Sequence, residues 1–87
     1  MVKKAVKIQN PTGMHARPAS MLVKEVKKYS AKIRLNKNGK DFDPSSILSI
    51  LSMGAKFGEE IVISADGPDE AAATDGVAAL FDSNFGE

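Results

Sequence analysis

The chain has 87 residues, which is enough for one domain with a single modest core and too few for a second. It contains no cysteine and one histidine, which excludes disulfides, thiolate catalysis and cysteine-based zinc sites and leaves a transition-metal site short of ligands. The net charge of +1 hides an asymmetry: residues 1–40 carry eleven lysines and arginines with one acid, whereas residues 41–87 carry one lysine and ten acids.

The first expected element is a strand that ends near Asn10. Its apolar residues Val2, Val6 and Ile8 alternate with lysines, which is the pattern of a strand with one buried face. The lysines also interrupt the apolar run that a signal peptide needs, and no later stretch reaches membrane-spanning length. We therefore expect a cytoplasmic protein that does not enter a membrane.

A turn and an amphipathic helix are expected next. Asn10-Pro11-Thr12-Gly13 breaks the strand, and helical spacing predicts a helix from Ala16 to about Lys28. The core-facing side is expected to hold Ala19, Leu22, Val23 and Val26. The opposite side holds Arg17, Met21, Lys24 and Lys28, so this helix has an apolar face and a basic face.

His15, the only histidine, lies where the turn meets this helix. The first N–H groups of a helix have no intrahelical acceptor, and the helix dipole adds partial positive charge, so anions bind there readily. Gly13 permits a backbone conformation closed to other residues, and Pro18 suits a first helical turn. Arg17 offers a fork of donors that fits phosphoryl oxygens. A lone histidine usually has no special chemistry, but these neighbours indicate phosphate chemistry.

A hairpin is expected after the helix. Ile33 and Leu35 alternate with polar residues, and Asn38-Gly39 is the two-residue turn typical of an antiparallel pair. The returning strand is short and carries Phe42.

A short apolar helix is expected to open at Pro44-Ser45-Ser46 and to stop at Gly54. From the residues alone, Ser45 or Ser46 is an N-cap. The apolar residues are too many to lie behind one narrow stripe, so some are expected to stay exposed: Ile47, Leu48, Ile50, Leu51 and Met53.

One more strand and one more helix complete the pattern. The strand carries Ile61, Ile63 and Ala65, and the helix is expected from about Asp69 to Ser83. Its inward residues are expected to be Ala73, Val77, Leu80 and Phe81, and Gly76 weakens it by about 1 kcal/mol relative to alanine. The order β-α-β-β-α-β-α predicts an α+β fold with helices layered on one face of an antiparallel sheet.

The segment from Asn10 to Ser20, with His15-Ala16-Arg17-Pro18 after a strand and a glycine turn, closely resembles the active-site segment of the HPr family. These are histidine phosphocarriers of the phosphoenolpyruvate:sugar phosphotransferase system. The resemblance runs through the whole chain to Phe85-Gly86-Glu87. It implies a single HPr-like domain over residues 1–87, folded as an open-faced β-sandwich of four strands and three helices.

The resemblance also implies the chemistry. Nδ1 of His15 accepts a phosphoryl group from phosphorylated enzyme I and passes it to enzyme IIA domains during sugar uptake. Arg17 offsets charge on the phosphoryl oxygens, and Ala16, Arg17 and Pro18 support the phosphate from the first helical turn. The chain is then a stoichiometric carrier and not an enzyme, and neither a cofactor nor a metal is expected. Met14 stands where the family more usually has leucine.

Ser46 matches a regulatory serine of HPr proteins from many Gram-positive bacteria. The resemblance implies phosphorylation by HPr kinase/phosphorylase, with a catabolite-control transcription regulator as a further partner. Ser49 stands where the family commonly has glycine, which leaves recognition by that kinase open. A phosphate at a helix N-terminus is tolerated by a fold, so it is expected to act by adding negative charge to a docking surface.

The resemblance further implies that the His15 helix and the short apolar helix together form the partner surface. Burial in the core is the default reading for a short apolar helix, whereas an apolar centre rimmed by lysines suits transient binding to acidic partners. The expected surface residues are Ser20, Met21, Lys24, Lys27, Ile47, Leu48 and Leu51. The protein is expected to be a monomer.

Three other functions fit these residues less well. A regulatory HPr-like module without phosphoryl flux typically lacks the histidine that this chain retains. A small hydrolase such as acylphosphatase needs a glycine-rich phosphate loop and a catalytic asparagine, and no segment matches them. Basic charge can also indicate nucleic-acid binding, but Tyr29, Phe42 and Phe57 do not cluster as a stacking platform, so nucleic acid is not an expected partner.

Overall fold

The computed structural model describes residues 1–86, so Glu87 of the expected 1–87 domain lies outside the described residues. The expected element order is confirmed. The strands are β1 (Val2–Lys7), β2 (Lys32–Lys37), β3 (Lys40–Phe42) and β4 (Glu60–Asp66). The helices are α1 (Ala16–Val26), α2 (Ile47–Ser52) and α3 (Glu70–Asp82), and a short 3-10 helix, η1 (Asn84–Gly86), follows.

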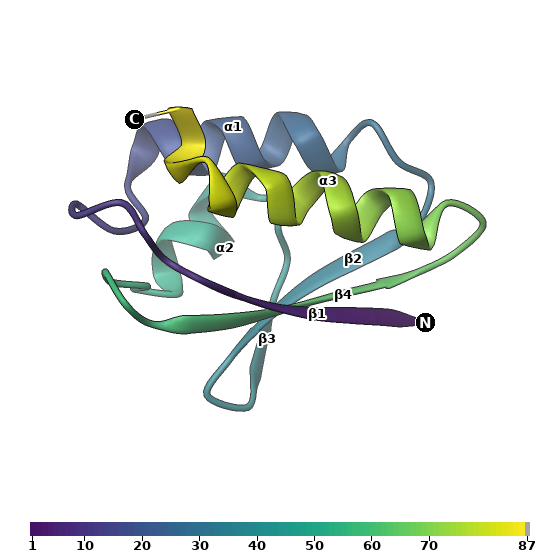
Figure 1. Ribbon diagram of the computed structural model, residues 1–87, viewed down its shortest axis with the longest axis horizontal. Coiled ribbons are helices and arrows are strands. Elements are labelled where there is room, and N and C mark those ends of the chain that lie inside the picture. The colour runs from purple at the N-terminus through teal and green to yellow at the C-terminus, as the bar shows by residue number, and fades with distance from the viewer. Residues whose placement is uncertain (87) are drawn as a thin grey trace.

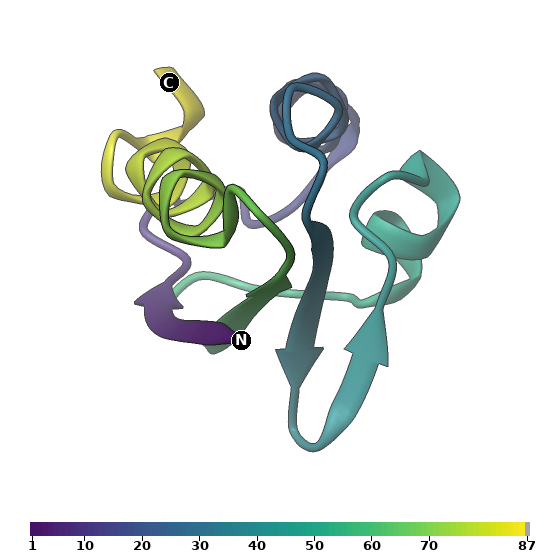
Figure 2. The ribbon, with the colours of Figure 1, turned by 90° about the vertical axis from the view of Figure 1, so that its right-hand side faces the viewer.

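The four strands form one antiparallel sheet in the order β1-β4-β2-β3. The three helices lie on the same side of this sheet, with α1 and α3 side by side above it and α2 next to α1 (Figures 1 and 2). No helix of residues 1–86 lies on the other side of the sheet (Figure 2), so the fold is the α+β arrangement that the element order predicts and the open-faced sandwich that the resemblance implies. No helix in residues 1–86 is both long enough and apolar enough to cross a membrane.

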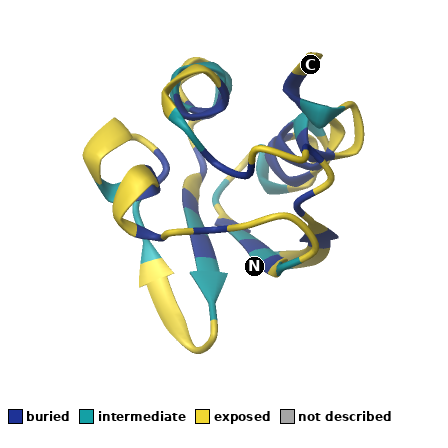
Figure 3. Cartoon of the chain, turned by 90° about the vertical axis from the view of Figure 1, so that its left-hand side faces the viewer, coloured by how far each residue is buried: buried dark blue, intermediate teal, exposed yellow. Residues whose placement is uncertain are grey.

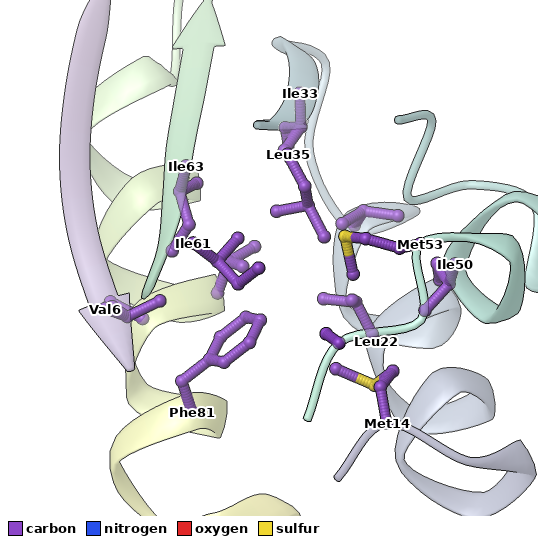
Figure 4. Close-up of a cluster of buried hydrophobic side chains, with 14 of the residues drawn as sticks. Val6, Met14, Leu22, Ile33, Leu35, Ile50, Met53, Ile61, Ile63 and Phe81 are labelled. Atoms are coloured by element: carbon purple, nitrogen blue, oxygen red, sulfur yellow. The ribbon is translucent and has the colours of Figure 1, made fainter. Parts of the chain in front are cut away.

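The core lies between the sheet and the helices. Every other residue of β4 points into it, so Ile61, Ile63 and Ala65 are buried as expected. Leu22 of α1 and Phe81 of α3 belong to the same hydrophobic cluster and enter it from the helical layer (Figure 4). Each fully buried side chain of this size stabilises the fold by roughly 1.5–3 kcal/mol relative to an exposed one.

The Asn-Gly hairpin is confirmed by its backbone geometry. Asn38 and Gly39 both take left-handed conformations, with φ of 54° and 85°, between the paired residues Lys37 and Lys40. This is the mirror-image turn whose twist matches an antiparallel pair, which explains why asparagine and glycine occupy it.

Two boundaries differ from the expected ones. The first strand ends at Lys7 instead of near Asn10, because Ile8 pairs with the loop before β4 and no longer with β4 itself. The first helix ends at Val26 instead of Lys28, because the amide of Lys28 bonds back to Glu25 in a tighter turn. Val23 and Leu80, expected to face the core, are only partly buried against it.

Gly76 has a packing role in α3 besides its low helix propensity. A β-carbon at this position would lie 2.0 Å from the hydroxyl oxygen of Tyr29 and 2.8 Å from the carboxylate of Glu25. Tyr29 donates a 2.7 Å hydrogen bond to that carboxylate. Glycine therefore permits the close approach of α1 and α3, which helical spacing alone does not reveal.

Candidate functional site

A tight turn carries the chain from β1 into the segment that holds His15. The amide of Gly13 donates to the carbonyl of Asn10 at 2.9 Å, and the fully buried Asn10 side chain donates to the carbonyl of Gly13. Gly13 takes a φ of 71°, which non-glycine residues rarely adopt. A β-carbon there would also lie 2.8 Å from the carbonyl oxygen of Ala55, so both the conformation and the contact require glycine.

The turn rests on the loop of residues 53–59, which joins α2 to β4. The amide of Met14 donates to the Ala55 carbonyl at 3.0 Å. Ile8 exchanges two backbone hydrogen bonds with the loop, accepting from Gly58 at 2.8 Å and donating to Glu59 at 2.9 Å. Both loops lie at the left-hand end of the molecule in Figure 1, which faces the viewer in Figure 3. The segment before His15 is therefore held on a fixed support.

His15 is the N-cap residue of α1. Its backbone is extended, with φ of −119° and ψ of −169°, and its carbonyl accepts the first helical hydrogen bond from Ala19 at 3.0 Å. Pro18 has no N–H, so Ala16 and Arg17 carry the amide donors of the first turn that precede this bond. His15 is partly exposed, Ala16 and Arg17 are exposed, and Pro18 is buried.

The N-terminal end of α1 is suited to bind an anion reversibly. The N-terminal end of an 11-residue helix favours negative charge, and a partly exposed imidazole lies at that end. Arg17 belongs to the same exposed turn, and the burial of Pro18 anchors the turn to the core. Within residues 1–86, no three His, Asp or Glu side chains are grouped so as to hold a metal ion.

Ser46 is the N-cap of α2, and the alternative cap, Ser45, has a different role. The hydroxyl of Ser46 accepts a hydrogen bond from the amide of Ser49 at 3.2 Å. Ser45 instead donates through its hydroxyl (2.7 Å) and its amide (2.9 Å) to the carboxylate of Asp43. These two hydrogen bonds lower the pKa of Asp43, and the bond from the Ser45 hydroxyl is the larger cause.

Ser49 has a structural role that the sequence did not reveal. Its hydroxyl accepts a 2.9 Å hydrogen bond from the amide of Asp43, three residues before the cap. The serine thus fixes the segment that leads into α2, a contact that glycine at this position could not make.

The expected exposure of α2 is confirmed. Its buried residue is Ile50, and Met53 after it is also buried, whereas Ile47, Leu48 and Leu51 are 43%, 79% and 38% exposed. The structure brings α2 against α1 (Figure 2), where the other expected surface residues lie. Of these, Lys24 and Lys27 are exposed and Ser20 and Met21 are partly exposed.

Two side chains near this surface, Lys37 and Phe57, were assigned no role from the sequence. Lys37, at the end of β2, donates to the carbonyls of Met53 and Gly54 at 3.0 and 3.3 Å, and so caps the C-terminal end of α2. It also lies 3.3 Å from the carboxylate of Glu59. The amide of Lys56 donates a 2.6 Å hydrogen bond to the same carboxylate. This bond is the main reason that the pKa of Glu59 is lowered, and Lys37 adds to the effect. Phe57, in the same loop, is 63% exposed.

A family model described as "PTS HPr component phosphorylation site" matches residues 2–83. The chain belongs to the HPr family. The match includes the turn before His15, α1 and α2. HPr proteins are phosphocarriers of the phosphotransferase system, and this chain is a phosphocarrier of that kind.

Individual relatives agree with the family assignment. The phosphocarrier protein HPr of Treponema pallidum (strain Nichols) is 36% identical over 87 residues, which cover 100% of this chain and 99% of that protein. The phosphocarrier protein NPr of Klebsiella oxytoca is 39% identical over 87 residues, with coverage of 99% and 97%. The crystal structure of HPr-C-His from Thermoanaerobacter tengcongensis superimposes with a TM-score of 0.95 at 38% identity, covering 100% and 98%. The HPr of that organism is also known as a crystallised dimer, with a TM-score of 0.79 at 38% identity and full coverage of both chains.

Proposed function

We propose that this HPr carries the phosphoryl group on Nδ1 of His15, receives it from phosphorylated enzyme I and passes it to enzyme IIA domains. The observation that supports this most directly is the place of His15, a partly exposed residue that is the N-cap of α1 and directly precedes Ala16 and Arg17 of the first helical turn. The lone pair of Nδ1 attacks phosphorus, the bond from phosphorus to the donor breaks, and the reverse step returns the group to an acceptor.

Arg17 and the helix end stabilise charge during this transfer. As the phosphoryl group moves, negative charge spreads over its three equatorial oxygens, where an arginine and helix N–H groups are most effective. The chain is regenerated when the group leaves, so it is a stoichiometric carrier and not an enzyme with its own turnover. A carrier of this relay works in the cytoplasm beside its donor.

The docking face of this HPr comprises α1 and α2. It consists of the apolar residues of α2 with the polar and basic residues of α1 next to them: Ser20, Met21, Lys24, Lys27, Ile47, Leu48 and Leu51. An exposed apolar centre with lysines at its rim fits an acidic partner that binds and leaves quickly.

Ser46 is proposed as a regulatory phosphorylation site for HPr kinase/phosphorylase, with a catabolite-control transcription regulator as a reader of the modified form. The hydroxyl caps α2 at the border of the docking face, and negative charge at a helix start is favourable for the fold. A phosphate there therefore adds charge to the face without disrupting the helix.

The test of carriage is incubation with phosphoenolpyruvate, magnesium and a purified enzyme I, followed by intact mass. We expect one acid-labile, alkali-stable phosphate per chain, which is absent from His15→Ala. A mass shift that persists in His15→Ala would refute the acceptor. Because identity with NPr is as high as with HPr, the second candidate is a relay served by the phosphoryl donor of NPr, and the same assay with that donor separates the two.

A monomer is the proposed state. The crystallised dimer of the Thermoanaerobacter tengcongensis HPr makes the dimer the alternative for this chain. Sedimentation of the purified protein distinguishes a monomer of 9.3 kDa from a dimer of twice that mass.

A further inference from the structure

Phe57 lies at the tip of a tight turn close to His15. The turn runs from Lys56 to Glu59 and is closed by a 3.1 Å hydrogen bond from the amide of Glu59 to the carbonyl of Lys56. Gly58 takes a φ of 86°, a conformation that favours glycine at this place in a turn. Among the aromatic residues of the described chain, Phe57 alone is exposed, at 63%.

This turn is held rigidly from both sides. Gly58 and Glu59 are hydrogen-bonded to Ile8, and the carboxylate of Glu59 binds both the Lys56 amide and the Lys37 ammonium. An aromatic side chain on a rigid turn loses little conformational entropy when a partner covers it, which is typical of anchor residues in interfaces.

The turn also lies next to the phosphoacceptor segment. The α-carbon of Lys56 is 3.3 Å from the point where a β-carbon of Gly13 would stand, and Gly13 is two residues before His15. The loop that carries Phe57 continues directly from α2, whose Leu48 and Leu51 are exposed. The loop that carries Phe57 therefore borders the segment that a protein approaches when it places a phosphorylated residue against His15.

Charge indicates the kind of partner. Lys56, the neighbour of Phe57, is exposed and is the only lysine or arginine in residues 41–87. Lys56 thus puts one exposed cation next to Phe57 in the chain, in a turn where the carboxylate of Glu59 is already paired with Lys37. A recess with an apolar floor and an acidic rim complements this pair.

We propose that Phe57 is an anchor residue for the phosphoryl donor, seated in an apolar, acidic-rimmed recess of enzyme I when His15 receives its phosphate. This inference rests on the proposed function and extends its docking face beyond the helices to the loop before β4. Phe57 determines recognition of the donor and takes no part in the chemistry at His15.

The test measures initial rates of phosphorylation by enzyme I at varied concentrations of this HPr, with phosphoenolpyruvate in excess. We expect Phe57→Ala to raise KM about tenfold, which is the loss of about 1.4 kcal/mol typical of an interface anchor, with kcat within about twofold of the parent. Phe57→Leu keeps an apolar side chain and should recover most of the affinity. Lys40→Ala is the control, because it removes a long exposed side chain from the distant hairpin.

Further measurements separate docking from folding and from chemistry. The melting temperature and the hydrolysis rate of isolated phosphohistidine should match the parent in Phe57→Ala, since the side chain is exposed and does not touch the phosphate. In addition, the Gly58 amide signal of the labelled parent should shift or broaden on addition of enzyme I.

The assignment of Phe57 is overturned if Phe57→Ala has the KM of the parent, or if its defect is confined to transfer to enzyme IIA. It is also overturned if the Gly58 amide signal of the parent does not change on addition of enzyme I. A parent chain that enzyme I binds but leaves unphosphorylated overturns the proposed function instead, and the Gly58 signal then decides the Phe57 contact by itself.

Discussion

The hydroxyl of Tyr29 occupies the space that a side chain at Gly76 would need, with only 2.0 Å between its oxygen and a β-carbon built on the glycine. The same hydroxyl donates to Glu25 one turn earlier on α1, and this bond is the main reason that the pKa of Glu25 is lowered. The two long helices of this HPr are therefore fitted to each other at a position where helix propensity alone would favour alanine.

Gly76→Ala is expected to destabilise the protein despite the better helix propensity of alanine. Overpacking of this kind costs typically 1–3 kcal/mol, or about 4–8 °C in melting temperature per kcal/mol for a domain of this size. The double variant Gly76→Ala with Tyr29→Phe should regain part of the loss, because the clashing oxygen is gone. Thermal melts of the single and the double variant measure these changes, with Tyr29→Phe alone as the control. A Gly76→Ala protein as stable as the parent contradicts the prediction.

Asp69 predicts a specific acid sensitivity. Its carboxylate accepts 2.8 Å hydrogen bonds from the amides of Ser30 and Ala31, which lower its pKa, with Ser30 the larger cause. A pKa lowered by folding stabilises the native state above the unfolded value of about 3.9, and the effect is lost as pH falls through the lower folded value. Urea unfolding of the parent and Asp69→Asn should therefore differ by a constant amount at neutral pH and converge under acid conditions. A gap that does not narrow in acid argues against the role of these bonds.

Arg17→Ala is expected to leave the fold intact and to slow phosphoryl transfer to His15. The side chain is exposed, so its loss costs little stability, whereas removing one donor to a developing charge typically costs about a hundredfold in rate. Lys28→Ala, which removes a cation at the other end of the same basic face, is the control. Single-turnover kinetics with phosphorylated enzyme I measure the effect, and a rate within about twofold of the parent disproves the role.

Ser46→Asp is expected to slow phosphorylation of His15 by enzyme I without lowering the melting temperature. Negative charge is favourable at the start of α2 but repels an acidic partner, and high salt should shrink the rate difference because exposed charges are screened over about 8–10 Å at physiological ionic strength. Rates and melts of both proteins at low and high salt check this.

Ser46→Ala is the matched control for the cap. It removes the 3.2 Å bond to the Ser49 amide and should lower stability by about 1 kcal/mol while leaving the rate unchanged. A Ser46→Asp protein that accepts phosphate as fast as the parent at low salt would defeat the electrostatic mechanism. A loss of stability in Ser46→Asp would mean that Ser46 is only a cap.

Local patterns were sufficient for the features that depend on near neighbours. Alternation located β4, the Asn38-Gly39 pair located the hairpin, and the residues around His15 located the start of α1, because each depends on a few consecutive residues. The exposure of α2 also followed from counting its apolar residues against the width of one helical stripe.

Contacts between distant segments could not be predicted in the same way. Lys37 reaches the end of α2 across 16 residues, and Asp69 reaches the amide of Ala31 across 38. Periodicity predicts which face of a helix or strand is buried. The hydrogen-bond partner of a polar side chain depends instead on how the helices and strands pack against one another, which cannot be predicted from one segment alone. The placement of the Phe57 loop beside the His15 segment could not be predicted for this reason, since it depends on hydrogen bonds from Ile8 and Met14 to residues more than 40 positions along the chain.

The short α2 has a consequence for the dynamics of the native state. Six residues form about 1.7 turns, and an isolated helix shorter than about 12 residues is marginal in water. One buried residue, Ile50, and polar contacts at its two ends hold it in place, whereas β4 is hydrogen-bonded along both edges. The amide protons of α2 should therefore exchange with solvent through local opening that leaves the sheet closed. An exposed helix that loosens without global unfolding can adjust to several differently shaped partners in turn.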